Sequence, residues 1–158
     1  ENTIASFSDT YFEVMLSAPE LSATALALFW GLMIPSRFLG GLVRTRQRQV
    51  FIVLSVSLIV FLTAGMLVDD HVLKIIFFAL SGFACGPLWP FLMDAVKSKD
   101  NGSSGPAFNI MFSLGAVGGA LLPMAGGQLA NAFPVSSVYY FCAAVALVML
   151  FVYFKAKN

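Results

Sequence analysis

The chain alternates between long apolar runs and short polar segments. Five runs carry at most one charged side chain each, and charged residues, glycine or proline separate them. Each run is about 19 to 26 residues long, enough for a helix rising 1.5 Å per residue to cross about 30 Å of hydrocarbon. The runs are continuous and do not alternate, as is typical of helices rather than membrane β-strands. The sequence therefore predicts five complete transmembrane helices, at residues 21–43, 50–68, 72–93, 105–130 and 135–154.

A shorter segment precedes the first run. ENTIASFSDTYFEVM, residues 1–15, has the apolar and aromatic content of a helix end, without the basic stretch or cleavage site of a signal peptide. We expect a partial helix over residues 1–16 whose beginning lies outside the given chain. Pro19 favours a turn into the first full span. The predicted fold class is an all-α integral membrane protein, with five complete helices and the end of a sixth in one helical domain over residues 1–158.

Composition supports this class. The 158 residues are 59% hydrophobic and 11% charged, with a mean hydropathy of +0.87. A soluble domain carries about 25% charged residues, so the surface of a soluble form would be coated with apolar side chains. The formal net charge of +1 gives no reason to expect nucleic acid as a partner. The lipid bilayer is the expected surrounding.

The loop charges predict the orientation. Five crossings place the segments between the helices on alternating sides. The first side receives Arg44, Arg46, Arg48, Lys97, Lys99, Lys155 and Lys157, and the second receives Asp69, Asp70, His71 and Lys74. Short loops rich in lysine and arginine stay in the cytoplasm. We therefore expect a multi-pass protein of the plasma (inner) membrane with a cytoplasmic C-terminus.

The residues that usually carry enzyme chemistry are sparse. His71 is the single histidine and lies in a predicted loop, which provides neither a metal cluster nor a nucleophile–base pair. Cys85 and Cys142 lie inside apolar runs, where thiols behave as small hydrophobic side chains. The chain contains no P-loop or dinucleotide-binding glycine pattern. We expect no enzymatic activity, no metal and no cofactor.

Arg37 stands inside the first full span, about two turns from its end, and is followed by Gly40 and Gly41. It can bond a neighbouring helix end, extend to the headgroup region or contact a solute, and the two glycines allow another backbone to come close. The stretch SRFLGGLV at residues 36–43, followed by a basic loop, resembles the G-R-x-x-G-G sequence in the C-terminal half of major facilitator superfamily transporters. That sequence is the repeat counterpart of the superfamily's motif A. Thr45 stands where motif A carries an aspartate.

The resemblance covers nearly the whole chain. Residues 5–16 and 26–31 are similar to the passage from the seventh to the eighth helix in the fucose-permease-like branch. Residues 81–91, SGFACGPLWPF, look like the tenth helix, and residues 115–123, GAVGGALLP, look like the eleventh. The five spans would then be helices eight to twelve. Residues 1–15 would be the end of helix seven, and the missing N-terminal half would be the partner of this chain.

Proline and glycine positions predict a break and a close contact. Gly86, Pro87 and Pro90 interrupt the backbone hydrogen bonds of the third span, which can mark a gate or a static kink. Gly115 and Gly119 form a small-xxx-small pair, which favours close packing of helices. These five residues, with Arg37, Gly40 and Gly41, are the predicted gating and packing positions.

Few polar or indole side chains lie within the spans, so each is a candidate solute contact. The predicted substrate-binding residues are Glu1, Asn2, Trp30, Trp89 and Asn109. Carboxylate and amide groups provide hydrogen bonds and indoles provide stacking surfaces, although Trp89 can instead be an interfacial anchor. The resemblance implies a cavity lined by the seventh-, eighth-, tenth- and eleventh-like helices. Ser55 and Ser57, on the ninth-like helix, are expected to face lipid.

The resemblance implies secondary active transport of a small polar solute by alternating access, with a sugar favoured by the branch. A protonatable residue in the missing half would allow coupling to a proton gradient. The alternative is a non-transporting membrane subunit with an assembly or scaffold role.

Overall fold

The computed structural model describes residues 1–97 and 104–155. Within these residues all regular structure is helical, and five helical spans are long and apolar enough to cross a membrane, the third of which, His71–Ala95, comprises α5 and most of α6. The predicted all-helical fold class and the predicted number of membrane-length spans are thereby confirmed. Lys99 and Lys157, which were assigned to the basic side, lie outside the described residues. The elements are α1 (Asn2–Ser6), α2 (Ser8–Thr10), the π-helix η1 (Tyr11–Met15), α3 (Pro19–Leu42), α4 (Gln47–Leu67), α5 (His71–Cys85), α6 (Leu88–Lys97), α7 (Ser104–Ala132) and α8 (Ser136–Lys155).

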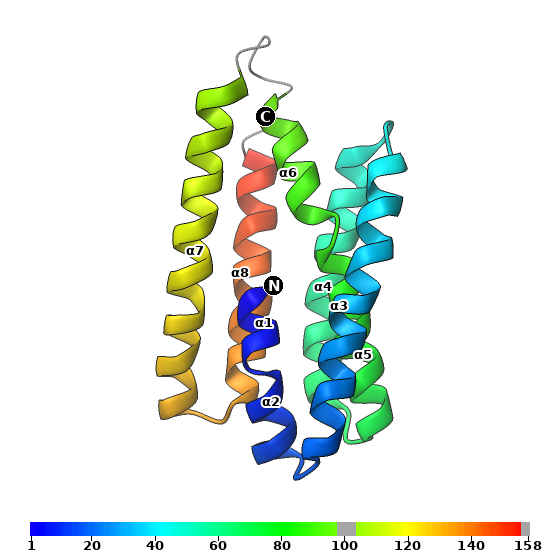
Figure 1. The fold of residues 1–158 in the computed structure, drawn as a ribbon, viewed down its shortest axis with the longest axis vertical. Helices are drawn as coiled ribbons and strands as arrows, with labels where there is room; N and C mark the ends of the chain where they lie inside the picture. Colours follow the sequence, from blue (N-terminus) through cyan, green and yellow to red (C-terminus); the bar gives the residue numbers. More distant parts are fainter. Residues whose placement is uncertain (98–103, 156–158) are drawn as a thin grey trace.

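The long helices run side by side, and successive helices point in opposite directions (Figure 1). The α3–α4 turn and the last described residues of α6 and α8 lie at the upper end in this view. The α4–α5 and α7–α8 turns lie at the lower end. At the upper end, the Arg48 guanidinium lies 5.8 Å from the centre of the Phe154 ring, and the Gln47 amide donates to Asp94 at 3.5 Å. The basic loop and the end of α8 therefore share one end of the bundle, as the alternation of loops requires.

The helix boundaries follow local sequence. α3 begins with Pro19, whose missing N–H is not needed in the first turn of a helix. α5 begins after Asp70, whose carboxylate accepts a hydrogen bond from the Leu73 amide at 2.8 Å and so caps the helix. Arg46, the residue before α4, has a left-handed backbone with φ 65°. The tight turn between α3 and α4 requires this conformation.

The first segment is not the regular helix that its composition predicts. α1 ends at Ser6, and η1 follows α2 with wider turns. Beyond η1, the Ala18 amide bonds to the Phe12 carbonyl six residues back. Tyr11 and Phe12 are adjacent and both are buried. Neighbouring residues point in different directions on a regular α-helix. Within η1 both rings lie in the core.

An aromatic core holds this segment against the other helices. The Phe12 and Phe29 rings both contact the Phe78 ring, with centroids 6.1 Å and 5.1 Å away. Tyr139 of α8 meets the Tyr11 ring edge-on at 5.2 Å. α4 packs between α5 and α8, whereas α1 lies against α7 and α8. Glu1 consequently lies midway along the bundle, beside the N label in Figure 1.

Candidate functional site

The third predicted span is broken where its prolines lie. α5 ends at Cys85 and α6 begins at Leu88, with Gly86 and Pro87 forming the turn between them. Pro90 has no N–H, and in a regular helix the amide of residue 90 would bond to the carbonyl of Gly86. Arg37 of α3 donates from Nε to this carbonyl at 3.3 Å. The guanidinium therefore supplies the hydrogen bond that Pro90 cannot make.

α3 packs directly against the break. A methyl group added at Gly40 would lie 2.7 Å from Cβ of Pro87, and one added at Gly86 would lie 2.8 Å from the Met33 carbonyl oxygen. Both distances are shorter than carbon atoms tolerate without movement. Gly41, by contrast, has open space around it. Gly40 and Gly86 thus allow the close approach that brings Arg37 within reach of the break.

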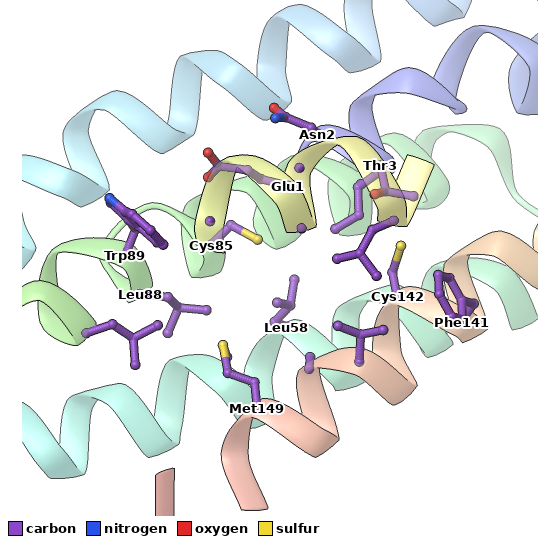
Figure 2. Close-up of a pocket in the computed structure, with 18 residues that line it drawn as sticks. Glu1, Asn2, Thr3, Leu58, Cys85, Leu88, Trp89, Phe141, Cys142 and Met149 are labelled. Carbon is purple, nitrogen blue, oxygen red and sulfur yellow. The ribbon is translucent and has the colours of Figure 1, made fainter. Parts of the chain in front are cut away.

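Beside the break lies a cavity of about 370 Å³. Residues of α1, α4, α5, α6, α7 and α8 line it, and it is open on one side. A site of this size lies near the lower end of the range of about 300–1,000 Å³ for small-molecule pockets. The lining residues are Glu1, Asn2, Thr3, Ile4, Leu58, Cys85, Leu88, Trp89, Leu92, Gly115, Gly118, Gly119, Leu122, Phe141, Cys142, Val145, Ala146 and Met149 (Figure 2).

The polar side chains of the lining are gathered on one element. Glu1, Asn2 and Thr3 belong to the first turn of α1, whereas the rest of the lining is apolar apart from the Trp89 indole and the thiols. In Figure 2 Glu1 and Asn2 lie along one side of the cavity, and Met149 lies on the other. The cavity therefore has a polar edge and an apolar body.

An ion pair connects this polar edge to the break. Arg37 Nη2 lies 3.2 Å from Glu1 Oε2 and 3.4 Å from Oε1. The side chains are 44% exposed for Arg37 and 34% exposed for Glu1, so water screens the pair and its contribution to stability is small. One guanidinium thus contacts both the carboxylate at the cavity and the carbonyl at the proline break.

Two glycines of α7 form part of the cavity wall. A methyl group added at Gly115 would lie 2.5 Å from Cη2 of Trp89, because the indole edge rests on the helix backbone there. At Gly119 the added methyl would lie 3.7 Å from the Asn2 amide nitrogen, an ordinary contact. The small-xxx-small pair therefore faces the cavity and lets α7 approach α6 and α1.

The structure brings three of the five predicted substrate-binding residues to this cavity, namely Glu1, Asn2 and Trp89. Trp30, half-exposed and edge-on to Phe29, and Asn109, exposed near the start of α7, are not in its lining. The helices that line this cavity differ from the expected set, because α4 and α8 line it and α3 does not. Leu58 is the residue that α4 contributes.

Ser55, expected to face lipid from α4, is instead fully buried in the protein. Its hydroxyl donates back to the Phe51 carbonyl at 2.8 Å, so its polar atom is satisfied within its own helix. Ser57, on another side of α4, is half-buried.

One polar cluster was not predicted. Lys74 is buried, and its ammonium donates to the Tyr11 hydroxyl at 3.2 Å and to the Gly65 carbonyl at 3.4 Å. The hydroxyl of Tyr139 is also buried, and it has no hydrogen-bond partner among the described residues. The available signal was that Lys74 is the single cation of its apolar run, the situation in which a buried role is expected.

Metal binding has no counterpart in the described part of the chain, where no three histidine, cysteine, aspartate or glutamate side chains come together. The two thiols at the cavity, Cys85 and Cys142, are free. The lining offers a carboxylate, an amide, a hydroxyl and an indole for polar contacts, and aliphatic side chains for apolar contact.

Comparison with known proteins gives one informative match. Over 55 residues the chain is 44% identical to a chicken (Gallus gallus) protein named "Lysosomal amino acid transporter 1 homolog". The match covers 33% of this chain and 18% of that protein, less than a fifth of its length. No protein-family model matches the chain, and no solved structure matches it.

Proposed function

We propose that this chain is the C-terminal half of a secondary transporter of the major facilitator type, which moves a small solute across a membrane by alternating access. The observation that carries the proposal is the cavity beside a broken helix, halfway along a bundle of membrane-length helices. Broken helices that line a cavity near mid-membrane are typical of solute sites in transporters. The partial similarity to a protein named as a transporter supports the same class.

The exposed surface of α7 supports a missing partner half. In the most apolar 18-residue stretch of this helix, no residue is buried within the described structure. Large side chains that remain exposed include Ile110, Phe112, Leu114, Val117, Leu121 and Met124. So much apolar surface needs lipid or protein to cover it. In the proposed transporter, the half upstream of Glu1 covers the cavity side and the bilayer covers the rest.

Two solute classes are candidates. The resemblance to the fucose-permease-like branch favours a sugar, whereas the name of the similar chicken protein indicates an amino acid. Coupling of transport to a proton gradient, through a titratable residue in the other half, stays a prediction.

The location in the plasma (inner) membrane and the cytoplasmic C-terminus also stay predictions. The cluster of Arg44, Arg46 and Arg48 supports this orientation.

A solute-dependent change in accessibility tests the proposal. In the full-length protein with Cys85 and Cys142 replaced by alanine, a cysteine is introduced at Gly118, where an added side chain meets open space next to the cavity. Its rate of reaction with an impermeant maleimide is measured in proteoliposomes with and without an amino acid or a sugar. Gly31, equally open but on α3 away from the cavity lining, is the matched control.

Alternating access predicts that one solute changes the rate at Gly118 by severalfold and leaves Gly31 unchanged. Uptake of the same solute into the vesicles should follow. If no solute changes either rate and none is taken up, while another membrane protein co-purifies stably, the chain is a non-transporting assembly or scaffold subunit and the proposal fails.

A further inference from the structure

Opposite charges lie side by side at the edge of the cavity. Arg37 Nη2 is 3.2 Å from Glu1 Oε2, and the Glu1 side chain lines the cavity. Both side chains remain partly exposed, and ion pairs in such surroundings are weak. Arg37 is not itself in the lining and adjoins the cavity through Glu1, so a charged solute that contacts the Glu1 carboxylate lies next to the guanidinium and meets no strong ion pair there.

The guanidinium has hydrogen-bond donors to spare. Arginine carries five N–H groups. Nε bonds to the Gly86 carbonyl and Nη2 to Glu1, and no other partner occurs among the described residues. A guanidinium pairs well with a carboxylate through two parallel hydrogen bonds, and the Glu1 carboxylate accepts bonds from an ammonium group. The pair thus presents one cation site and one anion site next to each other.

The rest of the cavity suits an apolar group. Leu58, Leu88 and Met149 lie across the cavity from the first turn of α1, and the Trp89 indole lies at its side (Figure 2). A monosaccharide carries hydroxyls around its whole ring, and those facing this wall would lose water without gaining a partner. A solute with its charges at one end and an apolar body at the other leaves no polar group against that wall.

We propose that the cavity binds a zwitterionic amino acid with an apolar side chain. The α-ammonium group contacts the Glu1 carboxylate, the α-carboxylate contacts the Arg37 guanidinium, and the side chain enters the apolar body beside Trp89. This inference rests on the proposed transport function and names its substrate class. It assigns substrate recognition to the ion pair, beyond the structural contact of Arg37 with the break.

Five probes separate the parts of this recognition. Binding to the full-length protein in nanodiscs is measured by calorimetry for L-leucine, 3-methylbutylamine, 4-methylpentanoate and D-glucose. The second and third probes keep the apolar body of leucine and remove its carboxylate or its amine. L-asparagine, which has nearly the shape of leucine, tests the apolar body. We expect each of the other probes to bind at least about tenfold more weakly than L-leucine.

Two variants assign the charges. Glu1→Gln should abolish the preference for L-leucine over 4-methylpentanoate, because the ammonium no longer gains an ionic partner. Arg37→Gln should abolish the preference over 3-methylbutylamine. Glu13→Gln and Arg48→Gln remove the same charges from exposed positions outside the cavity lining, and they should leave both preferences intact. If Arg37→Gln fails to fold, the effect of Glu1→Gln on the preference for L-leucine over 4-methylpentanoate still tests the inference.

The outcomes separate the inference from the function beneath it. If 3-methylbutylamine binds as tightly as L-leucine, the site recognises organic cations and the inference fails. Tighter binding of D-glucose or L-asparagine also overturns it, while uptake of that solute would preserve the transporter proposal. If none of the probes binds and no solute is transported, both the inference and the proposed function fall.

Discussion

The contact between Arg37 and the proline break can be tested by restoring the hydrogen bond that Pro90 removes. Arg37→Met takes away the donor to the Gly86 carbonyl and keeps an apolar side chain of similar length. Pro90→Ala returns a backbone N–H at the position that bonds to this carbonyl in a regular helix. One change removes a donor to the Gly86 carbonyl and the other supplies a new donor to it. Their effects on the free energy of unfolding should therefore not add.

The structure sets the expected size of this interaction. Gly86 is buried, and a buried carbonyl left without a donor costs about 1–3 kcal/mol. Arg37→Met also removes the exposed pair with Glu1, worth about 0.2–1 kcal/mol whether or not Pro90 is present. We therefore expect Arg37→Met to cost about 1–4 kcal/mol with proline at position 90 and less than about 1 kcal/mol with alanine there.

The measurement is the free energy of unfolding in mixed micelles for the full-length protein, the two single variants and the double variant. A coupling energy of at least about 1 kcal/mol confirms the replacement of the backbone donor. Glu1→Gln, tested in both backgrounds, controls for the ion pair and should show the same small cost in each. Equal costs of Arg37→Met in the two backgrounds would refute the reasoning and leave only the contact with Glu1.

Three further predictions concern the α7 wall of the cavity, the buried Lys74 and the orientation of the chain in the membrane. Gly115→Val should reduce solute binding at least about tenfold by displacing the indole that rests on it, whereas Gly31→Val, in open space and outside the cavity lining, should bind as before in the same calorimetric assay. Lys74→Ala should lower the free energy of unfolding by about 1–3 kcal/mol because its two acceptors lose their donor; an unchanged unfolding transition would contradict the buried contacts. A cysteine at Thr45 should be shielded from an impermeant thiol reagent in intact cells and one at Asp70 should react; the reverse pattern would overturn the orientation.

The number of helices and their approximate bounds could be predicted from the sequence, because the thickness of the bilayer's hydrocarbon core sets the length of a helix that crosses it. An apolar run of about 20 residues has few alternatives to a helix when backbone groups must be paired internally. The position of the break was also predictable, since Pro87 and Pro90 remove specific N–H groups. The acceptor that Pro90 leaves unpaired follows from counting four residues back. That Arg37 would reach it required the packing of α3 against α5.

The faces of the helices were not predictable in the same way. α4 is apolar all round, so its sequence does not distinguish a side toward lipid from a side toward protein. Leu58 and Ser55 face inward, and nothing in their chemistry separates them from neighbours that face outward. The resemblance implies a cavity lined by the seventh-, eighth-, tenth- and eleventh-like helices, whereas the cavity in this structure is also lined by α4 and α8 and is not lined by α3. Burial in a membrane protein is decided by packing more than by polarity.

The first segment shows how packing overrides local pattern. Its sequence predicts a regular helix end, but the structure has the wider turns of η1, in which the adjacent rings of Tyr11 and Phe12 are both buried. Lys74 then bonds to the Tyr11 hydroxyl, a contact between residues 63 positions apart. No local signal identifies such a partner. The lysine could be noted as unusual in its run, but its role depended on where the π-helix placed the phenol.

Two cations attach this segment to the same group of helices. Arg37 of α3 holds its beginning through Glu1, and Lys74 of α5 holds its end through Tyr11. On its other side the segment meets α7 at glycines, where Asn2 lies over Gly119 and the Phe7 ring lies against Gly126. Polar contacts fix distance and direction, whereas contact with small residues permits sliding. The cavity therefore lies between a segment held mainly by the buried contact of Lys74 and a helix that meets this segment at glycines, so we expect any change in cavity size to come from a shift of α7.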